Sequence, residues 1–454
     1  MVTGKSSKTA YFCTECGAEH AKWQGQCREC GQWNCLVEEK IVVKKGKASR
    51  TTSSEKKKIP EIDFASRDGY HTGITEFDRV LGGQLLPGMT VLLGGEPGIG
   101  KSTLILQAAE AYSRQGLDVL YVTGEESLAQ LKLRSKRLGV SGDNITAINT
   151  TSLEEVLGIL ASESYAIVMV DSIQTMATDS LDSPPGTVAQ VREVSHQLIS
   201  HAKVRGTGLF LIGHVTKDGV VAGPKLLEHM VDTVAYFEGD STHLYRMLRA
   251  TKNRFGSVAE IGLFEMQTAG LIEVANPSSL FLSDSRGQGR PGSVVTAVCE
   301  GNRPILVEVQ ALVTSANYGT PQRVAGGIDN KRLALLLAIL EKRCGYPMAA
   351  NDVFVSVAGG LRLSEPALDL PLMTAIASSL LNKPVDSSRA VVGEVGLSGE
   401  VRGVTLTERR VSEAARLGFK SLVLPEINVP QAGGQKIEIV GVNDIQTALE
   451  RTLG

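Results

Sequence analysis

Apolar residues between positions 66 and 275 form short runs that alternate with helical stretches. The runs read TVLLGG, DVLYVTG, AIVMVD, GLFLIG, TVAYFEG and YRMLRATKN, and a helical stretch begins at Lys101. Short, fully apolar runs that alternate with helices are typical of strands buried in a mainly parallel sheet. The pattern therefore predicts an α/β domain over residues 66–275.

A different pattern begins near residue 276. The apolar runs SVVTAVCEG and PILVEVQALV come first, followed by helical stretches at 331–340 and 366–381, the run VFVSVA and a hairpin pattern, VVGEVGLSGEVRGV. This mixture predicts an α+β domain over residues 276–454, clearest from residue 351.

The composition is that of a soluble globular protein. Of 454 residues, 42% are hydrophobic and 21% charged, and the length suggests two or three domains. No apolar run approaches the ~20 residues that span a bilayer, and the first residues lack a secretory signal, so we expect a cytoplasmic protein without membrane contact. Because the net charge is only −2, contact with nucleic acid requires local basic surfaces.

Four of the seven cysteines form two CxxC pairs with a glycine after each pair: Cys13, Cys16, Cys27 and Cys30. Two such turns present four thiolates to Zn²⁺ and leave no position for a catalytic water, which predicts a structural zinc ribbon over residues 11–36. A redox role is disfavoured because neither pair lies at a strand-to-helix junction. We interpret Cys35, Cys299 and Cys344 as isolated thiols. Whether the ribbon contacts DNA or protein stays open.

Residues 37–65 are rich in Lys, Ser and Thr and show little apolar periodicity. This composition predicts a basic flexible linker. Its charges also offer contacts to DNA phosphates, as an alternative to a purely solvated tether.

The segment GEPGIGKS, residues 95–102, lies between the run TVLLG and a helical stretch. Glycines let backbone N–H groups surround phosphate oxygens, and the helix N-terminus adds the positive end of its dipole. This context predicts a P-loop for ATP, with Lys101 on the β- and γ-phosphates and Ser102 on Mg²⁺. The predicted nucleotide-binding residues are Gly95, Glu96, Pro97, Gly98, Ile99, Gly100, Lys101, Ser102 and Thr103.

Two further runs end in acids. Asp171 closes AIVMVD, where a carboxylate organises the Mg²⁺ shell, although it can also cap the loop that follows. Glu125 follows DVLYVTG, and a carboxylate at this end of a strand can polarise the attacking water. We select Glu125 over Glu126, and either can instead favour the first turn of the helix near Ser127.

The cysteine pairs and the P-loop are followed by a third segment, KNRFG, formed by Lys252, Asn253, Arg254, Phe255 and Gly256. Together they resemble the bacterial RadA/Sms recombination and repair ATPases, relatives of RecA and of the DnaB helicases, in which KNRFG is the hallmark. The resemblance covers essentially the whole chain. It implies a RecA-like P-loop ATPase core, preceded by a zinc ribbon and followed by a Lon-protease-like domain.

The resemblance also implies roles for residues outside the P-loop. In ring ATPases, cations such as Lys252 and Arg254 reach the neighbouring subunit's γ-phosphate, whereas a solvated strand end is the alternative. His214 is the candidate sensor of that phosphate, or else a core histidine. Lys217, Lys225 and the segment 179–192 are candidate DNA contacts in mobile loops, unless these are ordinary surface loops.

The implied activity is DNA-dependent ATP hydrolysis by a homohexameric, helicase-like motor. It would translocate on single-stranded DNA and promote branch migration together with the RecA recombinase, with single-stranded and branched DNA as partners and ATP, Mg²⁺ and Zn²⁺ as cofactors. The alternative is a signalling or scaffold ATPase that resembles KaiC and acts on a protein partner.

The last third resembles the proteolytic domain of Lon, but the catalytic dyad is missing. Ala367 occupies the place of the serine nucleophile, and the place of the lysine base falls near Glu408. Since a methyl group cannot attack a carbonyl, we reject a Lon-type protease. A basic DNA surface and an ordinary solvated surface are both open for this domain. The candidate cations for DNA contact are Arg286, Arg290, Arg303, Arg323, Lys331, Lys342 and Arg343.

Overall fold

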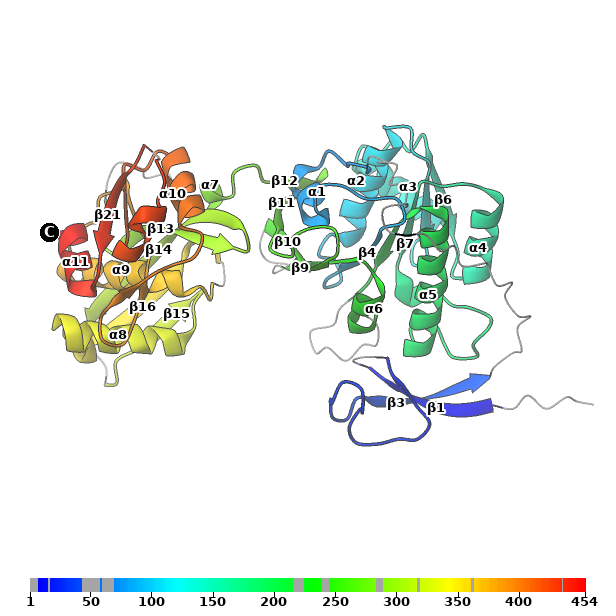
Figure 1. Ribbon diagram of the computed structural model, residues 1–454, viewed down its shortest axis with the longest axis horizontal. Helices are drawn as coiled ribbons and strands as arrows, with labels where there is room; N and C mark the ends of the chain where they lie inside the picture. Colours follow the sequence, from blue (N-terminus) through cyan, green and yellow to red (C-terminus); the bar gives the residue numbers. More distant parts are fainter. Residues whose placement is uncertain are drawn as a thin grey trace, which may run out of the picture. The chain divides into compact units, whose positions relative to one another are not determined.

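The computed structural model describes residues 7–14, 17–42, 58, 69–214, 224–238, 245–282, 289–316, 319–360, 363–434 and 436–454. The chain forms two compact units, Met1–Val274 and Ala275–Gly454 (Figure 1). Within the described residues, no helix is long and apolar enough to cross a membrane.

The chain begins with a small three-stranded antiparallel sheet in the order β2-β1-β3. Its strands are β1 (Ser7–Cys13), β2 (Glu19–His20) and β3 (Leu36–Val42). Strand β3 pairs with β1 over its whole length, from Ser7 opposite Val42 to Cys13 opposite Leu36. Our placement of the linker from residue 37 is therefore wrong at its start, because main-chain pairing with β1 holds residues 37–42 in the sheet.

The rest of the first unit is built on a nine-stranded sheet in the order β12-β11-β10-β9-β4-β8-β7-β5-β6. Strands β9, β4, β8, β7, β5 and β6 pair in parallel, and β9 to β12 form an antiparallel extension. The strands are β4 (Thr90–Gly94), β5 (Val119–Thr123), β6 (Ile145–Asn149), β7 (Ile167–Asp171), β8 (Gly208–Ile212), β9 (Thr233–Glu238), β10 (Tyr245–Asn253), β11 (Ile261–Gln267) and β12 (Gly270–Glu273).

Helices cover both faces of this sheet (Figure 1). The cluster under α1, α2 and α3 includes Phe77, Tyr112 and Phe210, and the cluster under α4, α5 and α6 includes Val156 and Leu198. The helices are α1 (Thr75–Leu81), α2 (Lys101–Ser113), α3 (Leu128–Arg137), α4 (Leu153–Ser162), α5 (Val188–Arg205) and α6 (Pro224–Met230). Two apolar faces explain why the central strands are apolar throughout, and the predicted α/β class is confirmed.

The second unit is a seven-stranded mixed sheet in the order β15-β16-β14-β13-β17-β20-β21. Its strands are β13 (Ser293–Glu300), β14 (Arg303–Ser315), β15 (Arg323–Gly326), β16 (Asn351–Val357), β17 (Arg389–Val391), β20 (Ser421–Pro425) and β21 (Glu438–Val442). Its helices are α7 (Ser278–Phe281), α8 (Asn330–Cys344), α9 (Asp369–Leu381), α10 (Thr407–Arg416) and α11 (Ile445–Leu453).

The hairpin predicted from VVGEVGLSGEVRGV is shorter than its sequence pattern. It consists of β18 (Glu394–Val395) and β19 (Val401–Arg402). The first valine of the pattern, Val391, is the last residue of β17, which pairs in parallel with β13 and β20 in the large sheet. The apolar start of the pattern is explained by burial in that sheet.

Candidate nucleotide-binding site and metal centre

The segment Gly95–Gly100 connects β4 to α2 in a conformation that requires glycine. Gly95, Gly98 and Gly100 have φ angles of 149°, 78° and 121°. A Cβ atom on Gly100 would lie 2.9 Å from Cε of Met266. This backbone presents N–H groups at the N-terminus of α2, as an anion-binding loop does.

Lys101 lies folded over this loop. Its side chain donates hydrogen bonds to the carbonyl oxygens of Gly95 at 2.8 Å and Glu96 at 2.9 Å, and the residue is 3% exposed. Burial lowers the pKa of Lys101 to about 8, against the opposing effect of the carboxylates of Asp171 and Glu125. A desolvated ammonium beside a loop of N–H donors fits the phosphates of a nucleotide.

Asp171 is the last residue of β7 and is buried. The hydroxyl of Tyr121 donates a 2.8 Å hydrogen bond to its Oδ2 atom. Ser102 occupies the first turn of α2. A carboxylate and a hydroxyl are oxygen donors of the kind that Mg²⁺ prefers, so the donor set fits that ion.

Glu125 is held by two side chains from neighbouring strands. Ser172 Oγ donates a 2.5 Å hydrogen bond to Oε1 of Glu125, and His214 Nε2 lies 3.1 Å from the same oxygen. The three residues follow β5, β7 and β8, which are adjacent and parallel, so their carboxyl ends meet at one edge of the sheet. Ser172 was not predicted from the sequence, where its only signal is its place directly after Asp171.

Glu126 points to a different partner. It forms an ion pair with Arg134 of α3. Ser127 caps the same helix through a reciprocal pair of hydrogen bonds with Gln130. The structure thus separates the two glutamates, with Glu125 at the strand ends and Glu126 bound to α3.

The cations of the KNRFG segment make contacts within their own chain. Lys252 Nζ donates to the carbonyl oxygens of Glu228 at 2.7 Å and Val231 at 2.8 Å, at the end of α6. Arg254 Nη1 lies 3.2 Å from Oδ1 of Asp232, and its side chain is 52% exposed. Neither contact joins these cations to the P-loop.

The last residue of the segment is a glycine for a steric reason. A Cβ atom on Gly256 would lie 2.7 Å from the Cα atom of Gly82. Asn253 and Phe255 complete the turn, since the Asn253 Oδ1 atom accepts a 3.0 Å hydrogen bond from the Phe255 N–H. The segment therefore packs closely against the end of α1.

The two cysteine turns of the ribbon are closed by corresponding hydrogen bonds. The Gly17 N–H donates to the carbonyl of Cys13 at 2.8 Å, and the Gly31 N–H donates to that of Cys27 at 2.9 Å. Both glycines have positive φ angles, 70° and 73°. These glycines allow each turn to close behind its cysteine pair.

Three of the described thiols gather beside these turns, and one of them, Cys35, belongs to neither CxxC pair. Cys13 Sγ lies 3.6 Å from Cys30 Sγ and 3.4 Å from Cys35 Sγ, and the three sulfurs lie within 4.8 Å of one another. Cys27 Sγ lies 3.3 Å from Nε2 of His20. Cys16 is outside the described residues. Our interpretation of Cys35 as an isolated thiol is wrong, because the pairing of β1 with β3 brings it to Cys13; the clustered thiols fit a metal ion such as zinc.

The comparisons with known proteins agree along the chain. Residues 11–38 match the family model of the rubredoxin metal binding domain, residues 70–164 that of the KaiC ATPase, and residues 328–428 that of subunit ChlI of Mg-chelatase. The DNA repair protein RadA of Halalkalibacterium halodurans is 48% identical over 98% of this chain and 99% of its own. The chain belongs to the RadA family.

Other members of the RadA family are almost as similar. The DNA repair protein RadA of Bacillus subtilis is 46% identical over 99% of both chains, and that of Escherichia coli is 44% identical over 98% of both. Among solved structures, an ATPase domain aligns with 46% of this chain and 94% of its own at a TM-score of 0.40 and 15% identity, too low to carry an argument. The family and the RecA-like ATPase with its zinc ribbon are thereby confirmed by the relatives and the family models.

The first unit of this RadA-family chain seats its ribbon on α5. Ala10 and Phe12 of β1 pack with Val188 and Ala189, and Arg192 Nη1 donates a 3.1 Å hydrogen bond to the carbonyl of Gly17. We expected a mobile loop over 179–192, and the structure places residues 188–192 of this segment in α5, so the loop is shorter than expected. The buried side chain of Gln190 fastens the loop by hydrogen bonds to the backbone of residues 178–183, and α5 begins at Val188.

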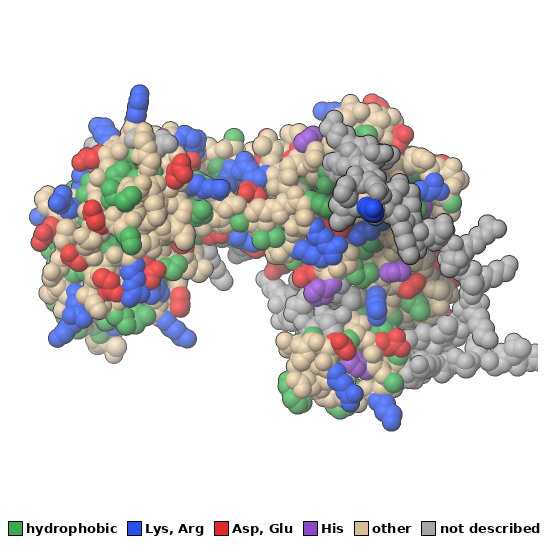
Figure 2. Space-filling view, in the orientation of Figure 1, with side chains coloured by type: hydrophobic (Ala, Val, Ile, Leu, Met, Phe, Trp, Pro, Cys, Tyr) green, Lys and Arg blue, Asp and Glu red, His purple; other side chains and the backbone are tan. Residues whose placement is uncertain are grey.

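Some of the predicted DNA contacts have side chains outside the described structure. Lys217 and Arg286 lie outside the described residues, and only the backbone of Lys225, in α6, is described. Figure 2 shows one face of the second unit, on which Lys and Arg side chains are interspersed with Asp and Glu. Among the described side chains, this face has no continuous basic patch.

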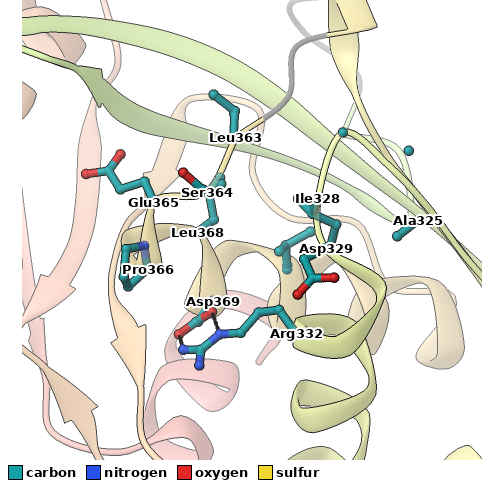
Figure 3. A pocket seen from close by; sticks show the side chains of 13 residues that line it. Ala325, Ile328, Asp329, Arg332, Leu363, Ser364, Glu365, Pro366, Leu368 and Asp369 are labelled. Atoms are coloured by element: carbon teal, nitrogen blue, oxygen red, sulfur yellow. Dashed lines mark hydrogen bonds and ion pairs between the residues drawn. The ribbon is translucent and has the colours of Figure 1, made fainter. Parts of the chain in front are cut away.

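A pocket of about 880 Å³ lies in the second unit of this RadA-family chain, beside the position where the resemblance to Lon places a nucleophile (Figure 3). The turn from β15 into α8 and the segment 363–372 line it, and an ion pair between Arg332 and Asp369 crosses its floor. Ala367 is buried in the neighbouring core.

An ion pair joins the two segments that would carry a Lon-type dyad. Arg410 of α10 is fully buried and pairs with Glu365, two residues before Ala367. It also donates to the carbonyl oxygens of Thr405 at 2.9 Å and Ala297 at 2.5 Å. Glu408, in the first turn of α10, lies at the protein surface. A structural salt bridge thus connects these elements.

Proposed function

We propose that this chain is a DNA-dependent ATPase of homologous recombination and DNA repair. It translocates on single-stranded DNA as a homohexameric ring and promotes branch migration together with RecA. The main support for ATP hydrolysis at this site is that Ser172 and His214 both contact the carboxylate of Glu125. These residues lie at the same edge of the sheet as Asp171. The name of the relatives, DNA repair protein, supports DNA as the partner.

The residues of the site divide the chemistry among them. The N–H groups of residues 95–100 and the Lys101 ammonium bind the phosphates, and Ser102 and Asp171 hold Mg²⁺, which neutralises phosphate charge when bound. Glu125 orients the attacking water and accepts its proton. Ser172 and His214 both contact Oε1, so the carboxylate presents Oε2 to the water.

Arg254 is our choice for the cation that acts in the neighbouring subunit's site. Its side chain is half exposed, and its partner Asp232 already accepts hydrogen bonds from the N–H of Thr90 at 3.1 Å and from its hydroxyl at 2.7 Å. Asp232 therefore stays satisfied if Arg254 swings away. Lys252 instead holds the end of α6 and so positions the segment that carries Arg254.

The second unit serves as an assembly and DNA-contacting module without proteolytic activity. The buried alanine at position 367 and the Glu365–Arg410 pair support the lack of proteolytic activity. The ribbon's clustered thiols support zinc as its metal.

The test is steady-state ATP hydrolysis with and without single-stranded DNA, repeated at rising salt. We expect stimulation that fades as salt rises, because contacts with phosphates release counterions. The Lys101→Ala variant is the negative control, for which we expect no ATP hydrolysis. If the intact chain hydrolyses ATP at a rate that DNA does not change at any salt concentration, the proposal is contradicted. That result would favour the alternative of an ATPase with a protein partner.

A further inference from the structure

The metal centre of the ribbon contains a thiol that the two CxxC pairs do not supply. The sulfurs of Cys13, Cys30 and Cys35 lie within 4.8 Å of one another, with Cys13 at 3.6 Å and 3.4 Å from the other two. Zinc–sulfur bonds of about 2.3 Å place the sulfurs of a tetrahedral site about 3.8 Å apart. The three thiols therefore have the approximate spacing of ligands that share one ion.

The sheet itself brings Cys35 to this centre. Cys13 ends β1 opposite Leu36, the first residue of β3, so Cys35 directly precedes the paired strand. The Thr14 N–H donates a 2.7 Å hydrogen bond to the Cys35 carbonyl, and the Cys35 side chain is 6% exposed. Because main-chain pairing fixes this position, Cys35 stays beside Cys13 whichever other thiols bind the ion.

Among the described cysteines of the two CxxC pairs, Cys27 is the one outside this cluster. Its sulfur contacts Nε2 of His20 at 3.3 Å, whereas Cys30 from the same turn lies beside Cys13. The turn that contains Cys27 and Cys30 therefore still supplies the Cys30 thiol to the metal centre when Cys27 does not bind there.

We propose that Cys35 is a fifth thiol ligand of this metal centre, which takes the place of Cys27 when the Cys27 thiolate is lost. In the exchange, the Cys35 sulfur bonds the ion and releases its proton to solvent, while the Cys27 sulfur leaves the ion and takes up a proton. The number of thiolates on the ion is unchanged. The inference does not depend on the ATPase activity.

The test counts zinc in the full-length protein. Wild type, Cys27→Ser, Cys35→Ser and the double variant are purified and passed through a mild chelator, with Cys299→Ser, in the second unit, as the matched control. We expect about one zinc per chain in all but the double variant, which should lose at least about 90% of it. Zinc loss from Cys27→Ser alone, or zinc retained by the double variant, would each overturn the proposal.

A second measurement covers the case in which Cys27→Ser does not fold. The two tryptophans of the chain, Trp23 and Trp33, both lie in the ribbon and are 59% and 69% exposed, so their emission reports on the ribbon. In the Cys35→Ser variant, we expect zinc release to excess chelator, followed by this emission, to be about tenfold faster than in wild type. An unchanged release rate would overturn the proposal.

Discussion

The Nε2 atom of His214 lies 3.1 Å from Oε1 of Glu125, although the two residues are 89 positions apart in the chain. Ser172 donates to the same oxygen from the strand between them. His214 Nδ1 is buried without a hydrogen-bond partner in the described part of the chain. The contact connects the end of β8 to the glutamate that we assign to the attacking water. A movement of His214 would therefore shift the Glu125 carboxylate through one hydrogen bond.

The two adjacent glutamates should differ sharply in a kinetic comparison. Glu125→Gln removes the carboxylate from the strand ends, and we expect kcat for ATP hydrolysis to fall about 100-fold or more. Glu126→Gln is the matched control, because it disturbs only the ion pair with Arg134, and it should keep kcat within about twofold. Equal losses in the two variants would refute the assignment.

Ser172 should act on turnover rather than on nucleotide binding. Removing its hydroxyl releases Oε1 of Glu125, and we expect Ser172→Ala to lower kcat about 10- to 100-fold while KM for ATP is unchanged. His214→Ala should give the same split. A rise in KM with kcat preserved would indicate a role in nucleotide binding and would exclude the positioning role.

Nucleotide binding should take up a proton at alkaline pH. The pKa of Lys101 is about 8 in the free site, and bound phosphates raise it, so a neutral Lys101 becomes charged on binding at pH 8 to 9. Affinity should accordingly fall as pH rises through 8. Calorimetry in buffers of different ionisation enthalpy measures the uptake, and Lys101→Arg, which stays charged, is the control. Identical uptake in the two proteins would exclude Lys101 as its source.

Alanine substitutions at Arg254 and Lys252 should have different effects, the first on ATP hydrolysis and the second on stability. We expect Arg254→Ala to abolish hydrolysis with the ring intact, and Lys252→Ala to destabilise the first unit by about 1 to 2 kcal/mol through lost contacts at the end of α6.

Action across subunits has its own signature in mixed rings. In the proposed ring, Arg254→Ala and Lys101→Ala subunits should each be inactive by themselves. A mixed ring would contain sites in which an intact P-loop lies next to an intact Arg254 of the neighbouring subunit. Mixing should therefore restore part of the activity. A mixture as inactive as either variant would show that both residues serve the same subunit.

Arg410 should be important for the stability of the second unit. Its guanidinium is fully buried, and Arg410→Ala leaves Glu365 without its counter-ion and the Ala297 carbonyl without a donor. We expect a loss of about 3 to 5 kcal/mol in the free energy of unfolding of this unit, measured by denaturant titration. The adjacent, exposed Arg409 is the control, with an expected change within about 0.5 kcal/mol. Similar losses at both positions would contradict a special role for the buried pair.

Features coded within a short stretch of sequence were predictable. The P-loop needs a strand, a glycine turn and a helix in succession, and residues 90–113 contain all three in order. The zinc ribbon was predictable because two CxxC turns with closing glycines have a known geometry. The buried strands β4, β5, β7 and β8 were predictable because both faces of each are covered, which leaves a continuous apolar run.

Only the tertiary structure decided which distant residues meet. Ser172 and His214 reach Glu125 because β5, β7 and β8 are neighbours in the sheet, and Cys35 reaches Cys13 because β3 pairs with β1. Lys252 contacts the end of α6 because β10 pairs with β9, the strand that follows α6. The sequence determined the chemical groups and their local geometry, whereas strand order, set by burial of the whole core, determined which of these groups act together.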